Sequence, residues 1–129
     1  MSLFKDYLEE RYEETDFPLQ TISDNFEAMM SDCGREILKD KDGFMCYELR
    51  GDAVICYDLY VKPEARGHTK AKELHDKVIS EALKAGKRVA ISFVELAGKD
   101  HFKGIKALKF YGLEPLFKTV DSFVFIKGI

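Results

Sequence analysis

The sequence predicts one α/β domain, residues 1–129, built on a mixed and mostly antiparallel six-stranded sheet with one parallel β-α-β crossover and about four flanking helices. Its length is sufficient for one hydrophobic core but not for two. Short strand patterns separated by turn residues follow a helical N-terminal part. An amphipathic helix then separates two apolar strand patterns, which favours a parallel pairing. We expect a helical part (1–34), a meander with the crossover (35–96), and a helix with a C-terminal hairpin (97–129).

The N-terminal part is expected to hold two helices. The first is predicted over residues 2–12, where apolar side chains recur at helical spacing behind Ser2, a suitable capping residue. The tripeptide Asp-Phe-Pro at 16–18 ends this helix. A second, shorter helix is predicted over residues 23–32, beginning at Ser23 or Asp24 and closed by Gly34.

The middle of the chain predicts a three-stranded meander. Strands are expected at 35–39, 44–50 and 53–62. The dipeptides Asp-Gly at 42–43 and Gly-Asp at 51–52 are turn signals between them.

The crossover follows this meander. From Thr69 the chain has apolar residues on one helical face, and Gly86 is a suitable C-cap. Residues 89–96 form an apolar run of strand length, which we expect to pair in parallel with 53–62. A helix at about 100–111 and two short strands at about 114–120 and 122–127 complete the chain.

Composition excludes several classes of protein. The chain is 46% hydrophobic and 33% charged, and no apolar run reaches the roughly 18 residues of a membrane span. The N-terminal sequence lacks a secretory pattern, so a cytoplasmic protein is expected. Cys33, Cys46 and Cys56 form no Cys-x-x-Cys pair and are expected to be reduced thiols. The three His residues form no ligand-spaced cluster, so no metal site is expected.

The charge is unevenly distributed. The formal net charge is -3, but residues 62–88 carry eight basic and four acidic side chains, which favours a local anion site. An ordinary solvated helix face explains this charge about equally well. Nucleic-acid binding is the weakest interpretation, because the basic residues are spread around the helix and mixed with acidic ones. These basic residues are Lys70, Lys72, Lys77, Lys84, Lys87 and Arg88.

The segment Tyr57-Asp58-Leu59-Tyr60-Val61-Lys62-Pro63-Glu64-Ala65-Arg66-Gly67 resembles the core of the GCN5-related N-acetyltransferase (GNAT) family. In that family a strand with a Leu-x-Val-x-Pro ending runs into an Arg/Gln-x-x-Gly-x-Gly/Ala loop that opens a long helix. Here Arg66 and Ala71 match the loop, whereas Thr69 stands at its central glycine. The resemblance covers residues 35–127 and implies an N-acetyltransferase that uses acetyl-CoA as co-substrate and an amine as acceptor.

The resemblance assigns the coenzyme site to the strand end and the loop. The implied coenzyme-binding residues are Leu59, Tyr60, Val61, Arg66, Gly67, His68, Thr69, Lys70 and Ala71. A helix N-terminus presents free N–H groups that can hold a pyrophosphate, and Arg66 and Lys70 add positive charge. The dipole contributes only about 0.3–2 kcal/mol, whereas micromolar affinity needs about 8 kcal/mol, so pantetheine and adenine contacts must supply most of it. The alternative is an ordinary strand-to-helix turn that Thr69 caps.

Acetyl transfer also requires a base near the acceptor amine. In the family, the two central parallel strands splay apart, which exposes a backbone N–H to the thioester carbonyl and admits the pantetheine arm. Asp58 interrupts the apolar pattern of the first of these strands and is the favoured general base. The equally weighted alternative is a structural aspartate that pairs with a lysine or caps a loop. Glu48 and Glu95 are weaker candidates.

The residue that would protonate the leaving thiolate depends on how the sequence is aligned with the family motif, and two alignments are possible. The family motif Asn-x-x-Ala-x-x-x-Tyr-x-x-x-Gly-Phe can place Tyr111 at the acid position, but Gly112 then falls three residues early. Aligning Gly112 instead places Leu108 there, with Gly104 and His101 at the alanine and asparagine positions. We slightly prefer the second alignment, because it needs no deletion.

The departures at Thr69 and Leu108 leave a second class of function open. Small phage-encoded proteins of this fold resemble the chain in both departures. The alternative to an N-acetyltransferase is therefore a non-catalytic interaction protein of the same fold. The acceptor that the resemblance implies is an amine of a small molecule or of a protein, and its site lies among the first helices and the hairpin loops.

Overall fold

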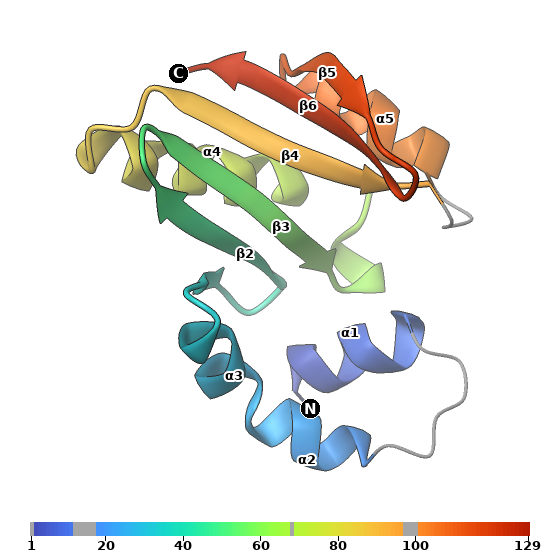
Figure 1. The fold of residues 1–129 in the computed structure, drawn as a ribbon. Coiled ribbons are helices and arrows are strands. Elements are labelled where there is room, and N and C mark those ends of the chain that lie inside the picture. The colour runs from blue at the N-terminus through green and yellow to red at the C-terminus, as the bar shows by residue number, and fades with distance from the viewer. Residues whose placement is uncertain (1, 12–17, 68, 97–100) are drawn as a thin grey trace.

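The computed structural model describes residues 2–11, 18–67, 69–96 and 101–129. The predicted coenzyme contact of His68 lies outside these described residues. The strands form one six-stranded sheet in the order β1-β2-β3-β4-β6-β5, and Figure 1 labels β2 to β6. The strands are β1 (Glu36–Lys39), β2 (Gly43–Arg50), β3 (Ala53–Val61), β4 (Val89–Glu95), β5 (Glu114–Lys118) and β6 (Ser122–Gly128).

Within the described residues, five α-helices and one short 3-10 helix accompany the sheet. The α-helices are α1 (Leu3–Arg11), α2 (Leu19–Asp24), α3 (Phe26–Asp32), α4 (Lys70–Lys84) and α5 (His101–Phe110), and the 3-10 helix η1 covers Pro63–Ala65. The pairing of β3 with β4 is parallel and every other pairing is antiparallel. The predicted α/β class, the mixed sheet and its single crossover are therefore confirmed.

The prediction of a single helix over residues 23–32 was wrong. Two short helices occupy this region and meet at Asn25. The N–H of Asn25 bonds to the carbonyls of Thr21 and Ile22, and its side-chain amide donates to Thr21 O at 2.8 Å. The interruption is thus local, because an asparagine side chain competes for the helix carbonyls. The start of α2 directly after Pro18 agrees with the tolerance of proline at the beginning of a helix.

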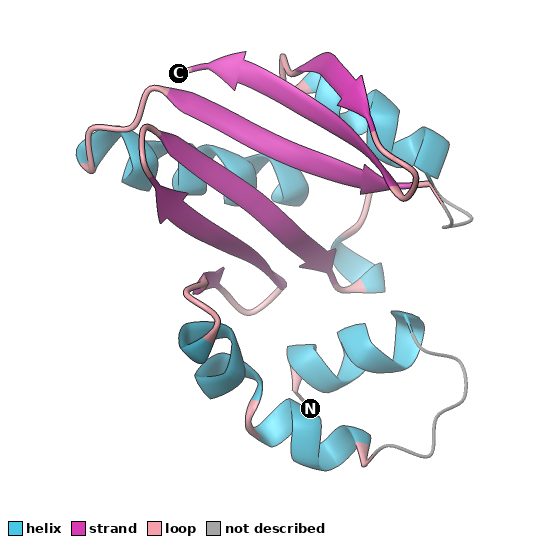
Figure 2. Ribbon diagram, in the orientation of Figure 1, coloured by secondary structure: helices cyan, strands magenta, loops and turns pink. Residues whose placement is uncertain are grey.

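Helices pack on both faces of the sheet. Figure 2 shows α4 and α5 behind it. Apolar side chains of α4 pack on β2, β3 and β4, and those of α5 pack on β4 and β6. The N-terminal helices α1 and α3 pack on the opposite face against Phe44, Cys46 and Tyr60. Phe44 is fully buried and contacts Phe4, Tyr7 and Phe26 through edge-on rings, which fixes these helices to β2.

The two core cysteines lie on opposite faces of the sheet. Cys46 belongs to the cluster under the N-terminal helices, and Cys56 belongs to the cluster under α4. Both are free thiols, and burial raises the pKa of each to about 12. They are therefore inert core residues at neutral pH. Among the described helices, none is both long and apolar enough to cross a lipid bilayer.

Candidate functional site

Strand β3 carries a bulge at the centre of the sheet. Two of its residues, Tyr57 and Asp58, lie opposite the single β2 residue Cys46. A bulge of this kind bends its strand and redirects side chains, and bulges are common beside active sites.

Strands β3 and β4 part at this bulge. Their last paired residues are Cys56 and Ser92. Both strands are described throughout and continue to Val61 and Glu95, but they do not pair beyond this point. The splaying of the central strands, which the resemblance implied, is thus present in the structure.

We call the space between β3 and β4 beyond Cys56 and Ser92 the gap. Backbone groups of β3 lie along its edge. Lys62 donates its N–H to Asp42 O on the β2 side at 2.8 Å. Because backbone groups alternate along a strand, the N–H groups of Leu59 and Val61 point to the opposite side, into the gap. Tyr60 points its N–H toward β2, and its ring is buried against the N-terminal helices. Of these three predicted contacts, only Leu59 and Val61 present an N–H to the gap.

The predicted coenzyme loop, residues 66–71, leads into the N-terminus of α4. Gly67 has a φ of +82°, a left-handed conformation that favours glycine, and a Cβ added there would meet no described atom beyond its chain neighbours within 4 Å. Thr69 occupies the N-cap position, but its side chain makes no capping hydrogen bond. Its hydroxyl instead lies 3.2 Å from Glu73 Oε1. The alternative in which the Thr69 side chain caps α4 was therefore wrong.

Arg66 is directed toward the N-terminal helix. Its Nε donates to Val61 O at 2.7 Å, and its Nη2 donates to both carboxylate oxygens of Glu10 at 2.8 and 2.7 Å. The guanidinium also lies 5.5 Å from the centre of the Tyr60 ring. Arg66 thus already forms an ion pair with Glu10 of α1, and a phosphate would have to compete with Glu10 for the guanidinium.

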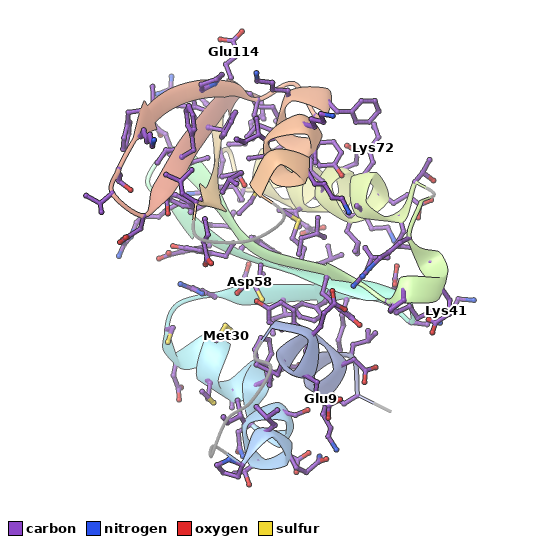
Figure 3. The ribbon with its side chains drawn as sticks, turned by 90° about the vertical axis from the view of Figure 1, so that its right-hand side faces the viewer. Glu9, Met30, Lys41, Asp58, Lys72 and Glu114 are labelled. Carbon is purple, nitrogen blue, oxygen red and sulfur yellow. The ribbon has the colours of Figure 1, made fainter. Side chains whose placement is uncertain are left out.

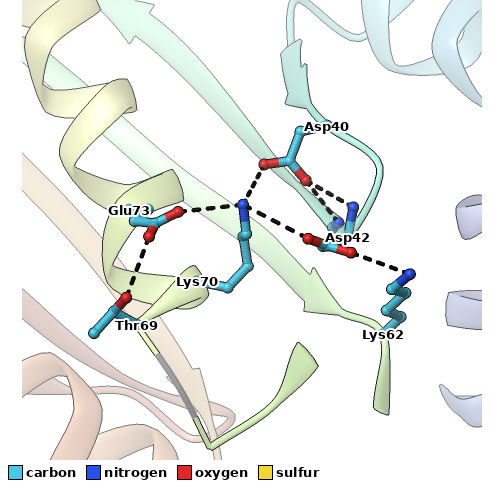
Figure 4. A network of polar contacts seen from close by, with 7 residues as sticks. Asp40, Asp42, Lys62, Thr69, Lys70 and Glu73 are labelled. Atoms are coloured by element: carbon cyan, nitrogen blue, oxygen red, sulfur yellow. Dashed lines mark hydrogen bonds and ion pairs between the residues drawn. The ribbon is translucent and has the colours of Figure 1, made fainter. Parts of the chain in front are cut away.

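Lys70 lies in a network of carboxylates, drawn in Figure 4. Its Nζ is 2.8 Å from Asp40, 3.2 Å from Glu73 and 3.9 Å from Asp42. These hydrogen bonds, first to Asp40 and then to Glu73, raise the pKa of Lys70. Burial opposes ionisation of Asp40, but hydrogen bonds from Lys70 and from the backbone N–H groups of Asp42 and Gly43 outweigh it and lower its pKa. The ammonium is therefore firmly charged and already paired.

A groove of about 390 Å³ lies between the beginning of α4 and the end of α5. It is lined by Thr69, Ala71, Lys72, Lys106, Ala107, Phe110 and Tyr111. The groove combines two ammonium groups with the exposed ring of Phe110 and the N-terminus of α4. Such a surface suits an anion joined to an apolar or aromatic group.

Sequence reasoning identified only part of this groove. Thr69, Ala71 and Tyr111 were predicted site residues, whereas Lys72, Lys106 and Phe110 were missed. The family's loop motif ends at Ala71, and its second motif concerns only the acid at the end of α5. The available signal was the i, i+4 spacing of Lys106 and Phe110, which places both on one face of α5.

Tyr111 lines the groove and is half-buried. Its ring stacks on His75, with ring centres 4.8 Å apart and planes at 16°. Its carbonyl accepts a hydrogen bond from Lys127 Nζ at 2.9 Å, and the same ammonium lies 3.1 Å from His75 Nε2. Burial raises the pKa of Tyr111, so its hydroxyl is protonated at neutral pH. Leu108, the other candidate for the acid position, packs instead against the cluster of Val94, Leu113 and Phe125.

Asp58 lies on the face of the sheet that carries the N-terminal helices, away from the groove residue Lys72 (Figure 3). Its carboxylate is partly exposed, 27%, and stands 3.9 Å from Arg35 Nη1. The same guanidinium stacks on the Tyr57 ring at 3.8 Å, and the Tyr57 hydroxyl donates to Glu48 at 2.9 Å. Asp58 is thus paired with an arginine and remains open to solvent beside the gap. Glu95 lies exposed at the far end of β4.

No protein-family model and no curated protein sequence matches the chain. Solved structures with the same fold are numerous. A GNAT-family protein from Desulfovibrio desulfuricans superimposes with a TM-score of 0.73 at 13% identity, over 98% of this chain and 90% of the other. The PaiA N-acetyltransferase from Thermoplasma acidophilum, in complex with coenzyme A, gives 0.71 at 14% identity, over 98% and 89%.

A third similar structure is the ribosomal-protein-S18-alanine N-acetyltransferase from Escherichia coli, with a TM-score of 0.65 at 14% identity, over 95% and 84% of the two chains. At these identities the similarity establishes the fold alone. The chain therefore has the fold of the GCN5-related N-acetyltransferases, as the resemblance of its central segment implied.

Proposed function

We propose that this protein is an acyl-CoA-dependent N-acetyltransferase. The observation that carries the proposal is the parting of β3 from β4 directly after Cys56 and Ser92. The groove with basic and aromatic residues lies between α4 and α5 on one face of the sheet. The partly exposed carboxylate of Asp58 lies on the other face, next to the point where the strands part. In the proposed complex the coenzyme extends from the groove to the parted strands, and its acyl group is presented there to an amine on the far side.

The groove residues fit a coenzyme A. The N–H groups at the beginning of α4 lack a side-chain cap and would receive the pyrophosphate. Lys72 and Lys106 would pair with phosphate charge, and Phe110 offers a face for stacking of the adenine. Lys72 is already bonded to Asp76 at 2.7 Å, but both side chains are exposed, so this pair is weak and exchangeable.

The chain supplies groups for each part of acetyl transfer. The amine nitrogen attacks the thioester carbonyl carbon, and an N–H on the gap edge of β3 stabilises the developing oxyanion. The N–C bond forms first, and the C–S bond breaks when the oxyanion returns to a carbonyl, which releases the thiolate. Asp58 accepts the proton that the amine loses, and Tyr111 donates a proton to the leaving thiolate.

Calorimetry with acetyl-CoA tests the coenzyme site. The double variant Lys72→Glu, Lys106→Glu should weaken binding by at least about tenfold, because two attractive charges become repulsive. Lys77→Glu is the matched control, since it reverses an exposed charge on α4 outside the groove and should leave the affinity nearly unchanged. An absence of heat at hundreds of micromolar acetyl-CoA would exclude the proposal.

A non-catalytic protein of the same fold is the second candidate. The pairing of Arg66 with Glu10 and of Lys70 with Asp40 favours it, because both predicted phosphate ligands are already neutralised. Release of free thiol from acetyl-CoA in the presence of a panel of amines separates the two candidates. Coenzyme binding without amine-dependent thiol release would favour the non-catalytic protein.

A further inference from the structure

An apolar row crosses the part of the sheet where β3, β4, β6 and β5 lie side by side. Phe93 of β4 pairs with Val124 of β6, and Val124 pairs with Phe117 of β5. Directly paired residues share a face of the sheet. The ring of Tyr57 on β3 stacks on Phe93, with centres 6.2 Å apart and planes at 17°. We call these four residues, Tyr57, Phe93, Val124 and Phe117, the apolar row.

The apolar row is accessible to solvent. The side chains of Phe93 and Phe117 are 40% and 53% exposed, large fractions for phenylalanine, and Val124 is buried between them. In the described part of the chain, the cluster under α1 and α3 takes its strand residues from β1, β2 and β3. Helices α4 and α5 cover the other face of β4 and β6 (Figure 2). The row therefore lies on the same face of the sheet as the N-terminal helices, beyond the strands that these helices cover.

The row begins at the gap between the central strands. Tyr57 and Phe93 each follow directly after the last residue pair, Cys56 and Ser92. Asp58 is the next residue in the bulge of β3. An amine whose proton passes to Asp58 therefore has the ring pair of Tyr57 and Phe93 beside its nitrogen.

The surroundings of Asp58 limit where the rest of the acceptor can lie. On the β2 side the face is filled by the buried rings of Phe44 and Tyr60 under the N-terminal helices. Arg35 covers one face of Tyr57 at 3.8 Å. The apolar row is therefore the open direction that the described residues leave for a substituent on the amine.

We propose that the acceptor is a small primary amine that carries an aromatic ring or a bulky apolar group, which lies on the apolar row. This inference rests on the proposed acetyltransferase function. The carboxylates of Asp58 and Glu48 complement the ammonium of such a ligand, and Phe93, Val124 and Phe117 complement its apolar part. A polyhydroxylated or polycationic amine would leave these side chains without a matching partner.

The size of the row favours a small molecule over a protein. Three strand spacings of about 4.8 Å give a length of roughly 14 Å, enough for one ring and a short chain. The exposed parts of its two phenylalanines amount to a few hundred Å² at most, since a whole aromatic side chain covers about 150–250 Å². A stable protein interface needs about 800 Å² from each partner.

Steady-state acetylation of matched amines tests the proposal. 2-Phenylethylamine should be acetylated with a kcat/KM about 10–100-fold above that of n-butylamine and of spermidine. Phe93→Ala and, separately, Phe117→Ala should lower this preference several-fold. Leu83→Ala removes an exposed apolar side chain from α4, outside the groove and the row, and should leave the preference unchanged. Equal rates for all three amines would overturn the proposal while leaving the acetyltransferase function intact.

Direct binding separates failure of this inference from failure of the proposed function. Titration with 2-phenylethylamine, followed by NMR, should shift the resonances of Tyr57, Phe93 and Phe117, and n-butylamine should not. Selective binding without turnover would retain the row as an amine site and reject the acetyltransferase. A preference for a peptide N-terminus over 2-phenylethylamine would overturn the proposal. So would a concentration-dependent dimer, detected by sedimentation, that Phe117→Lys dissociates.

Discussion

At the scale of single residues, Gly43 shows how closely β2 and β3 approach each other. A Cβ at this position would lie 2.3 Å from the backbone oxygen of Tyr60 and 3.2 Å from Leu74 Cδ1. Because the nearer atom is backbone, Gly43→Ala requires a shift of one strand. We expect a loss of roughly 3 kcal/mol in the free energy of unfolding, at the upper end for overpacking.

Urea denaturation measures this loss, and Gly128→Ala is its matched control. Gly128 is also a strand glycine, but no atom lies within 4 Å of a Cβ added there. This substitution should change the free energy of unfolding by no more than about 0.5 kcal/mol. Similar midpoints for the two variants would contradict the close approach at Gly43.

His75 is a second residue with a measurable consequence, since only 2% of its surface is exposed. Burial, reinforced by the nearby charge of Lys127, lowers its pKa to about 4 from the usual 6.5. The unfolded chain therefore binds a proton between pH 6.5 and 4 that the folded chain excludes. Stability from this group is complete above pH 6.5 and is lost as the pH falls toward 4.

Between pH 7 and pH 5 this effect should cost about 2 kcal/mol of the free energy of unfolding. His75→Phe keeps a ring that can stack on Tyr111 but cannot be protonated, so its stability should change less over the same interval. Denaturation curves at pH 7 and pH 5 give the change in the free energy of unfolding for the parent protein and for the variant. Parallel behaviour of the variant and the parent protein would show that other groups control the acid sensitivity.

At the scale of elements, the junction between β3 and α4 is tied to α1 through Arg66 and Glu10. Both side chains are about half exposed, so this pair contributes little to stability. Its effect should instead appear in coenzyme binding, because Glu10 competes with a phosphate for the same guanidinium. We expect Glu10→Gln to lower the Kd for acetyl-CoA by roughly two- to fivefold.

Glu9→Gln removes the same charge from the same helix and is the control, since the ion-pair partner of Glu9 among the described residues is Lys5. Calorimetry on the two variants separates a local contact from a general change in charge. An equal gain in affinity for both would indicate that Arg66 takes no direct part in binding the coenzyme.

The elements also show which features the sequence alone could predict. The meander, the crossover helix and the terminal strands follow from local periodicity and turn residues, and the structure agrees to within a few residues. The break at Asn25 between α2 and α3 was missed, because it depends on one side chain that competes for backbone carbonyls. The family resemblance, and not periodicity, predicted that β3 and β4 part.

The site was less predictable than the fold because it depends on contacts between distant segments. Arg66 and Lys70 were predicted to face a phosphate, but their pairing with Glu10 and Asp40 spans 56 and 30 residues of sequence. The groove between α4 and α5 likewise depends on how two helices pack on one sheet. A motif read along the chain contains none of this information.

At the scale of the whole molecule, the sheet separates two chemically different sides. The groove and Tyr111 lie on the side of α4 and α5, whereas Asp58 lies on the side of the N-terminal helices (Figure 3). In the proposed reaction the coenzyme reaches from one side to the other where β3 and β4 stop pairing, beyond Cys56 and Ser92. A substitution on the groove side should therefore change binding of the coenzyme. A substitution on the Asp58 side should change removal of the proton from the amine.

This separation predicts the behaviour of Asp58→Asn. The substitution removes the proposed base but no group that lines the groove, so kcat should fall by about 10²–10⁴ while the Kd for acetyl-CoA stays within about twofold. The Arg35 partner is partly exposed, so folding should be retained. Asp32→Asn, at the exposed end of α3, removes the same charge and should leave both quantities unchanged. Steady-state kinetics and calorimetry on the same preparations measure the two effects. A parallel loss of coenzyme affinity would mean that Asp58 supports the architecture of the gap and not the transfer of a proton.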